Sequence, residues 1–350
     1  MIVAVWYGIV AFSLSTYVVL DGRNFGAGML QRFVAREPLE RRQVIAAIGP
    51  LWTWHEVWFV STGGAIFLAF PRLLASAFSG YYLALFLILW CVVLRGVSIE
   101  VGGHIDDRLW QTFWDAVFTL SSALLALLFG AALGNVIRGV PLHADGTFYM
   151  TFFTDFRAKG DVGLLDAYTV SVAFFCALVL AAHGATYLTA RTEGPVHARA
   201  VAMARRLWLA AIPGFLAISM FTSRVRPELF QGLASRPLAW LGVATCAGSA
   251  VALFTGLRSG QEQRAFLGSS FLLQGILMSG AATLFPVMLF STLDANDRLT
   301  AHNCAAPHES LVAASLWWPF SLILAFVYVF VVRHYYSDRV RASRDTATPY

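Results

Sequence analysis

The sequence predicts an all-α, polytopic membrane protein. Three observations support this class: hydrophobic residues make up 58% of the 350 residues, charged residues only 13%, and the apolar residues gather in nine long runs. A chain of this composition cannot cover a water-soluble surface. Because about 20 apolar residues cross the hydrocarbon core, and a helix satisfies its own backbone polar groups, each run is expected to be a transmembrane helix. The short alternating segments of an outer-membrane barrel are not found.

Nine spans are predicted in a single transmembrane domain that covers residues 1–350. The last part of this domain, residues 333–350, is predicted to be a cytoplasmic tail. The spans lie near Val3–Leu20, Ile45–Phe70, Leu73–Leu94, Asp115–Ile137, Val162–Ala190, Leu207–Phe221, Pro237–Leu257, Phe266–Phe290 and Leu311–Val332. No positively charged segment precedes the first span, and further spans follow it. We therefore expect it to be a retained helix and not a cleaved signal peptide.

The basic residues predict the orientation of the chain. With nine spans, 17 of the 25 Lys and Arg residues fall on one side of the membrane and 8 on the other. Because positive residues accumulate on the cytoplasmic side, we expect the N-terminus outside and the C-terminus in the cytoplasm. The same loops account for the net charge of +5, so no nucleic-acid partner is expected.

The first span carries a polar stripe that a lipid-facing helix would not have. Tyr17, Asp21, Asn24 and Gly28 are spaced i, i+4, i+7 and i+11, so they share one face if the helix continues through Leu30. Such a stripe indicates contact with another helix. The alternative is that Asp21 marks the helix end at the cytoplasmic interface.

The second span holds the densest group of polar residues. Trp52, Thr53 and Glu56 lie on one side of the predicted helix, whereas His55 points about 100° away. A carboxylate inside a span is costly to ionise and can hold or pass a proton, as a proton relay requires. The alternative for Glu56 is a buried hydrogen bond. His55 is a candidate haem ligand or, more commonly, a hydrogen-bonded core residue; His183 is the other histidine at a plausible depth.

The remaining spans give weaker signals. The tryptophans at 52, 54 and 58 are candidates for helix packing, for contact with a planar group, or for the wall of a path for a small gas. Asp115 and Asp166 lie near predicted span starts, where a negative charge favours a helix N-terminus. The four cysteines are scattered and form no CxxC pair, so neither a metal site nor a disulfide is expected.

Several stretches together resemble subunit II of the cytochrome bd-type quinol oxidases. The stretch DGRNFGAGML from Asp21 is similar to the family pattern DGxDxGxGML, and IGPLWTWHEVW from Ile48 is similar to IGPxWDGNEVW. Shorter matches follow in family order, among them Leu94-Arg95-Gly, Gly134-Asn135 and Gly184-Ala-Thr-Tyr187. It is the order of the motifs over most of the chain that makes the resemblance specific.

The resemblance implies two four-helix bundles plus one peripheral helix, pairing with a homologous subunit I in a bacterial inner membrane. It implies that haems b and d and quinol oxidation belong to subunit I. This chain would support the haem-bearing core, contribute to proton and oxygen access, and bind a quinone only in a structural role. Quinol and O2 would be the substrates of the complex, and small accessory membrane subunits are further partners that the family allows.

The chain departs from the family at acidic positions. Asn24 stands where the family has a second acid, and Thr53 stands where it has an aspartate associated with a proton route. A threonine cannot take up a proton near neutral pH. Glu56 or His55 is a candidate replacement, or protons enter through the partner alone. Asp21 and Glu56 are thus the first candidates for the proton route, and Trp58 is a candidate for oxygen access.

Two other functions are compatible with the sequence. A secondary transporter would place its substrate site at the polar segments of the first two spans, although transporters usually interrupt helices in both halves. A purely structural or assembly subunit is the third hypothesis, which the replaced acids favour.

Overall fold

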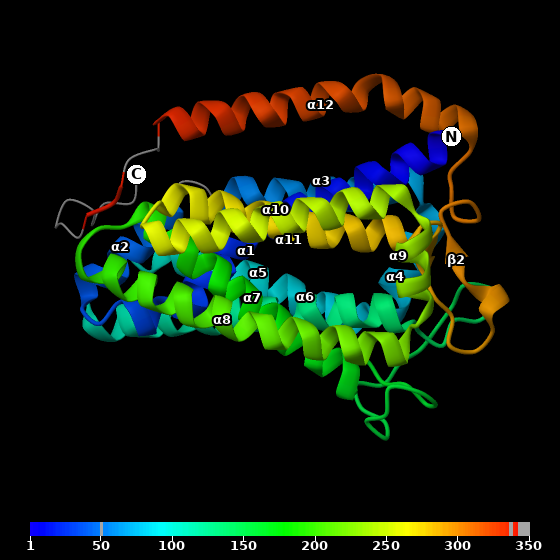
Figure 1. Cartoon of the computed structure of the whole chain (residues 1–350), viewed down its shortest axis with the longest axis horizontal. Coiled ribbons are helices and arrows are strands. Elements are labelled where there is room, and N and C mark those ends of the chain that lie inside the picture. Colours follow the sequence, from blue (N-terminus) through cyan, green and yellow to red (C-terminus); the bar gives the residue numbers. More distant parts are fainter. Residues whose placement is uncertain (50–51, 336–338, 342–350) are drawn as a thin grey trace.

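The chain folds into long, nearly parallel helices (Figure 1). The computed structural model describes residues 1–49, 52–335 and 339–341. The helices of the described part are α1 (Ile2–Val34), α2 (Pro38–Ile48), α3 (Trp52–Ala69), α4 (Pro71–Gly80), α5 (Tyr82–Val101), α6 (Arg108–Arg138), α7 (Ala167–Arg191), α8 (Gly194–Val225), α9 (Glu228–Ser235), α10 (Pro237–Ser259), α11 (Glu262–Leu284) and α12 (His308–Tyr335). Two short antiparallel strands, β1 (Val287–Leu289) and β2 (Leu299–Thr300), lie between α11 and α12.

Among the described residues, eight helices are long and apolar enough to cross a membrane, and a bent pair brings the count to nine if it is one span. The bent pair is α3 with α4, whose axes differ by 119°. The N-terminus lies at one end of the molecule (Figure 1), whereas Val340 lies at the other, its amide donating to Arg191 O at 2.8 Å. Termini at opposite ends fit an odd number of crossings. The all-α polytopic class is confirmed.

The second and third predicted spans have wrong boundaries. The span Ile45–Phe70 is divided, because α2 ends at Ile48 and α3 begins at Trp52. The span Leu73–Leu94 joins α4 to the first part of α5, which runs on to Val101. Hydropathy does not register these breaks, since apolar residues continue through them. Pro71, the first residue of α4, lacks an N–H that a helix start leaves unpaired anyway, and so favours a new helix there.

The first and sixth predicted spans are too short. Helix α1 runs on from Leu20 to Val34, and α8 covers Gly194–Val225.

The end of the chain also differs from the prediction. The span Phe266–Phe290 is too long, because α11 ends at Leu284 and strand β1 follows. The predicted tail over 333–350 begins too early, because α12 continues to Tyr335. Of the residues after α12, the structure describes only 339–341.

Helix α1 is the centre of the assembly, since it packs against α3, α6, α7 and α11. Helix α6 packs between α5 and α7, α8 packs against α7, and α10 packs against α11. Helix α12 lies along the outside (Figure 1). Helices α1 and α7 approach closely, and a Cβ on Gly26 of α1 would lie 2.0 Å from Leu180 O of α7. Only glycine permits that approach.

Candidate functional site: a buried charge cluster between α1, α3 and α5

Asp21 lies in the interior of α1, because the helix continues unbroken to Val34. The predicted stripe is confirmed: Tyr17, Asp21, Asn24 and Gly28 are all buried. The interpretation of Asp21 as a helix end is wrong. The stripe turns one charged group and one amide toward the neighbouring helices, where they meet polar partners from α3 and α5.

The partner of Asp21 is Arg95 of α5. Its Nη1 and Nη2 donate to Oδ1 and Oδ2 of Asp21, each at 2.8 Å, and both side chains are fully buried. The Arg95 guanidinium also lies over the Phe25 ring, 4.7 Å from its centroid. A two-point, charge-assisted contact of this kind is among the strongest polar interactions in proteins.

The sequence analysis missed Arg95 by assigning it to a cytoplasmic loop. It drew the third span as ending at Leu94, whereas α5 runs from Tyr82 to Val101. Arg95 is thus well inside the helix. The available signal was the glycine pair at 102–103, which is a better end for an apolar run than an arginine.

Glu56 of α3 is the third charged member of the cluster. Its Oε1 accepts a hydrogen bond from Arg95 Nη2, the same nitrogen that contacts Asp21. One cation thus faces two carboxylates. The Glu56 side chain keeps 15% exposure, whereas Asp21 has none. Asp21 and Arg95 neutralise each other, so Glu56 can hold a proton without breaking that buried pair.

His55 lies next to Glu56 in sequence but faces α1. Asn24 Nδ2 is 2.6 Å from its Nδ1, and Arg23 Nη2 is 2.7 Å from its Nε2. Both neighbours present donor groups, and a neutral imidazole accepts at one ring nitrogen only. The Oδ1 atom of Asp21 lies 3.9 Å from His55 Nδ1. His55 is therefore a hydrogen-bonding residue beside Asp21, whose Oδ1 also accepts from Asn24 at 2.9 Å.

The acidic residue of α5, Glu100, lies one to two turns from Arg95 toward the end of the bundle that carries α2. The indole Nε1 of Trp52 donates to Glu100 Oε1 at 3.1 Å. The Trp52 ring lies against Gly96, where a Cβ would be 3.0 Å from the indole. Glu100 was not among the predicted site residues, because the third span was drawn too short to include it.

Two of the predicted residues lie away from the charge cluster. Thr53 is exposed and has no hydrogen bond from its side chain within the described part of the chain. Trp58 is buried, with its ring edge-on to Phe12 of α1 and Phe326 of α12, at centroid distances of 6.4 and 6.3 Å. Trp54 stacks on Tyr328 of α12 at 3.8 Å. Trp54 and Trp58 therefore both contact α12, whereas Trp52 contacts α5.

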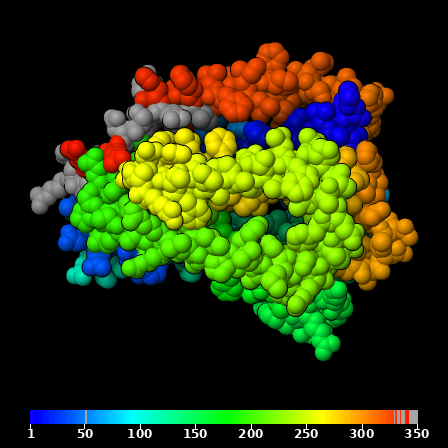
Figure 2. Space-filling view, viewed as in Figure 1, coloured from blue at the N-terminus to red at the C-terminus, as the bar shows by residue number. Residues whose placement is uncertain are grey.

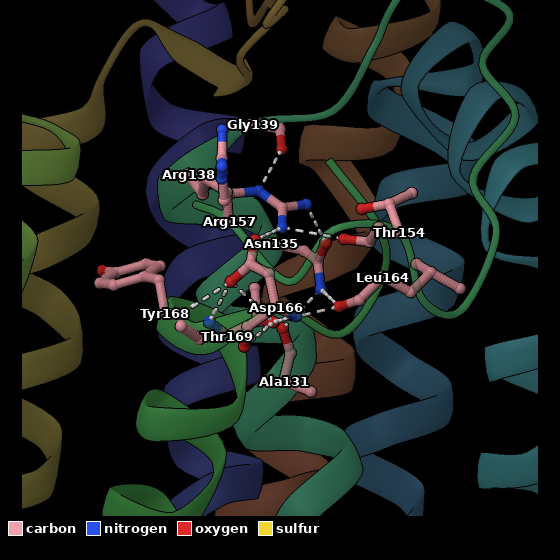
Figure 3. A network of polar contacts seen from close by, with 12 residues as sticks. Ala131, Asn135, Arg138, Gly139, Thr154, Arg157, Leu164, Asp166, Tyr168 and Thr169 are labelled. Carbon is pink, nitrogen blue, oxygen red and sulfur yellow. Dashed lines mark hydrogen bonds and ion pairs between the residues drawn. The ribbon is translucent and has the colours of Figure 1, made fainter. Parts of the chain in front are cut away.

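A second buried network closes the other end of the bundle (Figure 3). Asp166 accepts from the backbone N–H groups of Tyr168 and Thr169, each at 2.8 Å, so it caps α7 as predicted. It also pairs with the buried Arg138, which the sequence analysis wrongly placed in a loop. Asn135 joins this pair by accepting from Arg138 Nη2 at 2.6 Å. The network secures the loop before α7.

The other predicted cap is wrong. Helix α6 begins at Arg108, with Asp107 as its cap, so Asp115 lies inside the helix. Asp115 instead pairs with Arg41 of α2 at 2.6 Å. The predicted span began seven residues too late because the polar first turn of α6 lowers its hydropathy.

The sequence model of the cytochrome bd terminal oxidase subunit II family matches residues 2–336. The chain belongs to this family. Cytochrome bd-I ubiquinol oxidase subunit 2 of Escherichia coli (strain K12) is 30% identical over 335 residues, covering 88% of this chain and 86% of the relative. Cytochrome bd ubiquinol oxidase subunit 2 of Bacillus subtilis is 29% identical over 348 residues, covering 99% and 98%.

A solved structure shows the same fold. The bd oxidase from Geobacillus thermodenitrificans superposes with a TM-score of 0.75 at 15% identity, covering 95% of this chain and 98% of that one. The chain is thus a cytochrome bd subunit II, a component of a membrane oxidoreductase with a subunit I as its partner. These findings favour the oxidase over the secondary transporter.

The two histidines considered as haem ligands, His55 and His183, both have polar neighbours at their ring nitrogens. His55 has both ring nitrogens against Asn24 and Arg23, and His183 has Nδ1 at 2.8 Å from Ser269 Oγ and Nε2 at 3.0 Å from Val19 O. Neither has a nitrogen free for iron. The described residues contain no group of three or more His, Cys, Asp or Glu side chains that could hold a metal ion.

Proposed function

We propose that this chain is the non-haem subunit of a quinol:O2 oxidoreductase in a bacterial cytoplasmic membrane, and that it supports a subunit I carrying haems b and d. The observation that carries the proposal is the family match over residues 2–336. The lack of a free histidine nitrogen at His55 and His183 supports the division of labour between the subunits. A quinone bound here would have a structural role.

The charged residues support the proposed orientation. Arg23, Arg95 and Arg138 lie inside helices and no longer count as loop residues, but the excess of basic residues stays at the end of the bundle that carries α2. Positive residues accumulate in the cytoplasm, so this end is assigned to the cytoplasm and the N-terminus to the outside.

The proposed proton route enters at that cytoplasmic end. Glu100 is the acidic residue nearer the entrance, and it accepts a hydrogen bond from Trp52, which lies one helical turn before Glu56 in α3. Arg95 contacts both Glu56 and Asp21. Glu56 is assigned the proton-carrying role, since its carboxylate is the one not required to neutralise Arg95. Its exposed part opens toward the outside of this chain, which subunit I is proposed to cover.

The other candidates receive different roles. His55 and Asn24 are positioning residues that hold Asp21, and Thr53 has no part in the route, since it faces away from the cluster. Trp58 lies in an apolar, aromatic setting between α1, α3 and α12, which supports a place along an oxygen path. Small accessory subunits are further partners of the complex.

The experiment is purification of this chain from cells that also express its subunit I. We expect a coloured preparation that contains both chains, shows haem b and haem d absorption, and consumes oxygen when a quinol is added. A colourless preparation of this chain alone, stable and active in moving a solute, would overturn the proposal in favour of the transporter. If the complex with Glu56→Gln kept full activity, Glu56 would have no part in proton delivery, and this chain would have only a structural role.

A further inference from the structure

A cavity of about 410 Å³ lies beneath α9, at the end of the bundle opposite α2. The polar side chains that line it are those of Arg226, Glu228, Arg236, Thr283, Ser291, Arg298 and Thr300. Helix α8 ends just before it, α10 begins beside it, and the last turn of α11 forms part of its wall. The cavity therefore lies where three membrane-spanning helices end.

Two of the arginines are held in place by backbone carbonyls. Arg226 Nε donates to Ile137 O at 3.2 Å, and its guanidinium lies 4.2 Å from the centroid of the Phe290 ring. Arg236 Nη1 donates to the carbonyls of Ala282 and Thr283 at 2.9 and 2.8 Å. Because carbonyl oxygens carry no net charge, these contacts fix two cations at the cavity without neutralising them.

The third arginine, Arg298, is exposed on the loop between the strands. Within the described part of the chain, none of the three arginines forms an ion pair with a carboxylate, and Glu228 is the one acidic side chain in the lining. The cavity carries three positive charges against one negative charge. Arginine presents N–H groups in a fork that matches the oxygens of a phosphate.

The cavity lies at the depth of lipid headgroups. No residue of α9 is buried, and Phe230 in α9, with Leu238 and Trp240 at the start of α10, is exposed. Exposed tryptophan at a span end is typical of the membrane–water interface. Figure 2 shows a hollow in the surface between α8 and α10, beside α9. Apolar surface thus adjoins the arginines.

We propose that this cavity binds the phosphate of an anionic phospholipid. The three arginines meet the phosphate, and the apolar side chains of α9 and α10 contact the acyl chains. The neighbouring apolar surface and the interfacial depth favour a lipid over a free phosphate ion, which would need only the arginines. The proposal concerns a site separate from the Asp21 and Glu56 cluster, and the assigned proton route does not depend on it.

The test uses the assembled oxidase, purified in detergent and stripped of lipid. Phosphatidylglycerol, phosphatidylcholine or inorganic phosphate is then added, and Tm and the apparent affinity for each are measured. We expect phosphatidylglycerol to raise Tm most strongly and inorganic phosphate to leave it unchanged. Arg298→Gln should weaken the response to phosphatidylglycerol by about fivefold, since one basic residue near an anionic headgroup supplies about that factor. Ala295→Glu, which adds a negative charge to the lining, should weaken it further.

Arg224→Gln is the matched control. Arg224 is an exposed arginine in the last turn of α8, at the same end of the bundle, but it does not line the cavity. This variant should respond to phosphatidylglycerol as the unaltered protein does. Equal responses in Arg298→Gln, Ala295→Glu and Arg224→Gln would overturn the proposal. A Tm rise with inorganic phosphate as large as that with phosphatidylglycerol would also overturn it, by indicating a free-anion site.

Discussion

The Arg95 guanidinium holds the Asp21 carboxylate by two hydrogen bonds of 2.8 Å in the interior of the helix bundle. Burying two charges is costly, and the cost is offset only when the geometry is good and the remaining donors are satisfied. Here Arg95 also serves Glu56, so one cation organises two carboxylates from two other helices. The pair therefore ties α5 to α1, and Glu56 adds α3.

Removing the cation should destabilise the subunit. In Arg95→Gln, Asp21 and Glu56 remain buried together without a countercharge, and we expect a loss of about 3–5 kcal/mol of stability. The double variant Arg95→Gln with Asp21→Asn should recover part of this loss, because it also removes one of the unpaired charges. Tm of the purified oxidase measures both.

The matched control for that prediction is Arg42→Gln. Arg42 pairs with Asp106 at 3.2 Å, and the Asp106 side chain is 96% exposed. Exposed pairs contribute little to stability. If Arg95→Gln lowered Tm no more than Arg42→Gln does, the buried pair would not have the structural importance assigned to it.

Glu56→Gln should stop proton delivery while the fold is kept. Glutamine retains the shape of the side chain and an oxygen that can accept from Arg95 but cannot exchange a proton. We expect quinol oxidase turnover and proton uptake to fall by about a hundredfold with unchanged haem content. Oxygen consumption and the pH change of a weakly buffered solution give the two rates.

His55→Gln is the contrasting variant. Because both ring nitrogens face the donors Asn24 and Arg23, a neutral acceptor should replace the imidazole without loss of proton uptake. Turnover in His55→Gln close to that of the unaltered enzyme would fit this role. A collapse of turnover in His55→Gln, together with normal turnover in Glu56→Gln, would reverse the assignment of these two neighbours.

The sequence predicted the polar stripe of α1 because helical periodicity places Tyr17, Asp21 and Asn24 on one face if the helix continues past Leu20, and α1 does continue to Val34. It did not predict Arg95 or Glu100 as site residues, because both depend on where α5 ends. Apolar residues run through the junction of α4 and α5 at Tyr81, so hydropathy moved the whole span toward the N-terminus. Arg95, a charged residue inside α5, then resembled a loop residue. Arg138 was misplaced for another reason, since the predicted span ended one residue before it, at Ile137.

The crossing of α1 and α7 depends on glycine. A Cβ at Gly26 would lie 2.0 Å from Leu180 O and 2.7 Å from Gly184 Cα, so Gly26→Ala should force the helices apart. We expect a cost of about 1–3 kcal/mol and a lower yield of assembled oxidase. Gly63→Ala in α3 is the control, since no atom lies within 4 Å of the added methyl group. Equal yields of the two variants would contradict the close approach.

Glu40 of α2 should make the stability of the protein depend on pH in the acid range. Burial alone would raise its pKa, but the ion pair with Arg199 at 2.6 Å and hydrogen bonds from the backbone N–H groups of Arg36 and Glu37 outweigh burial, so the pKa is lowered. A carboxyl group whose pKa is lower in the folded state binds fewer protons there than in the unfolded state. Its contribution to stability is therefore fully present above its ordinary pKa, near 4.5, and is lost as the pH falls through the folded value.

Glu40→Gln should consequently lower Tm at pH 7, and the difference from the unaltered protein should narrow as the pH is brought below about 4.5. The pair joins α2 to α8, and Arg199 also donates to Val34 O at the end of α1, at 2.6 Å. Thermal unfolding of the purified oxidase between pH 7 and pH 4 measures the effect. A Tm difference that stayed constant over this range would mean that Glu40 acts through shape and not through charge, since only the ionised carboxylate gains from Arg199.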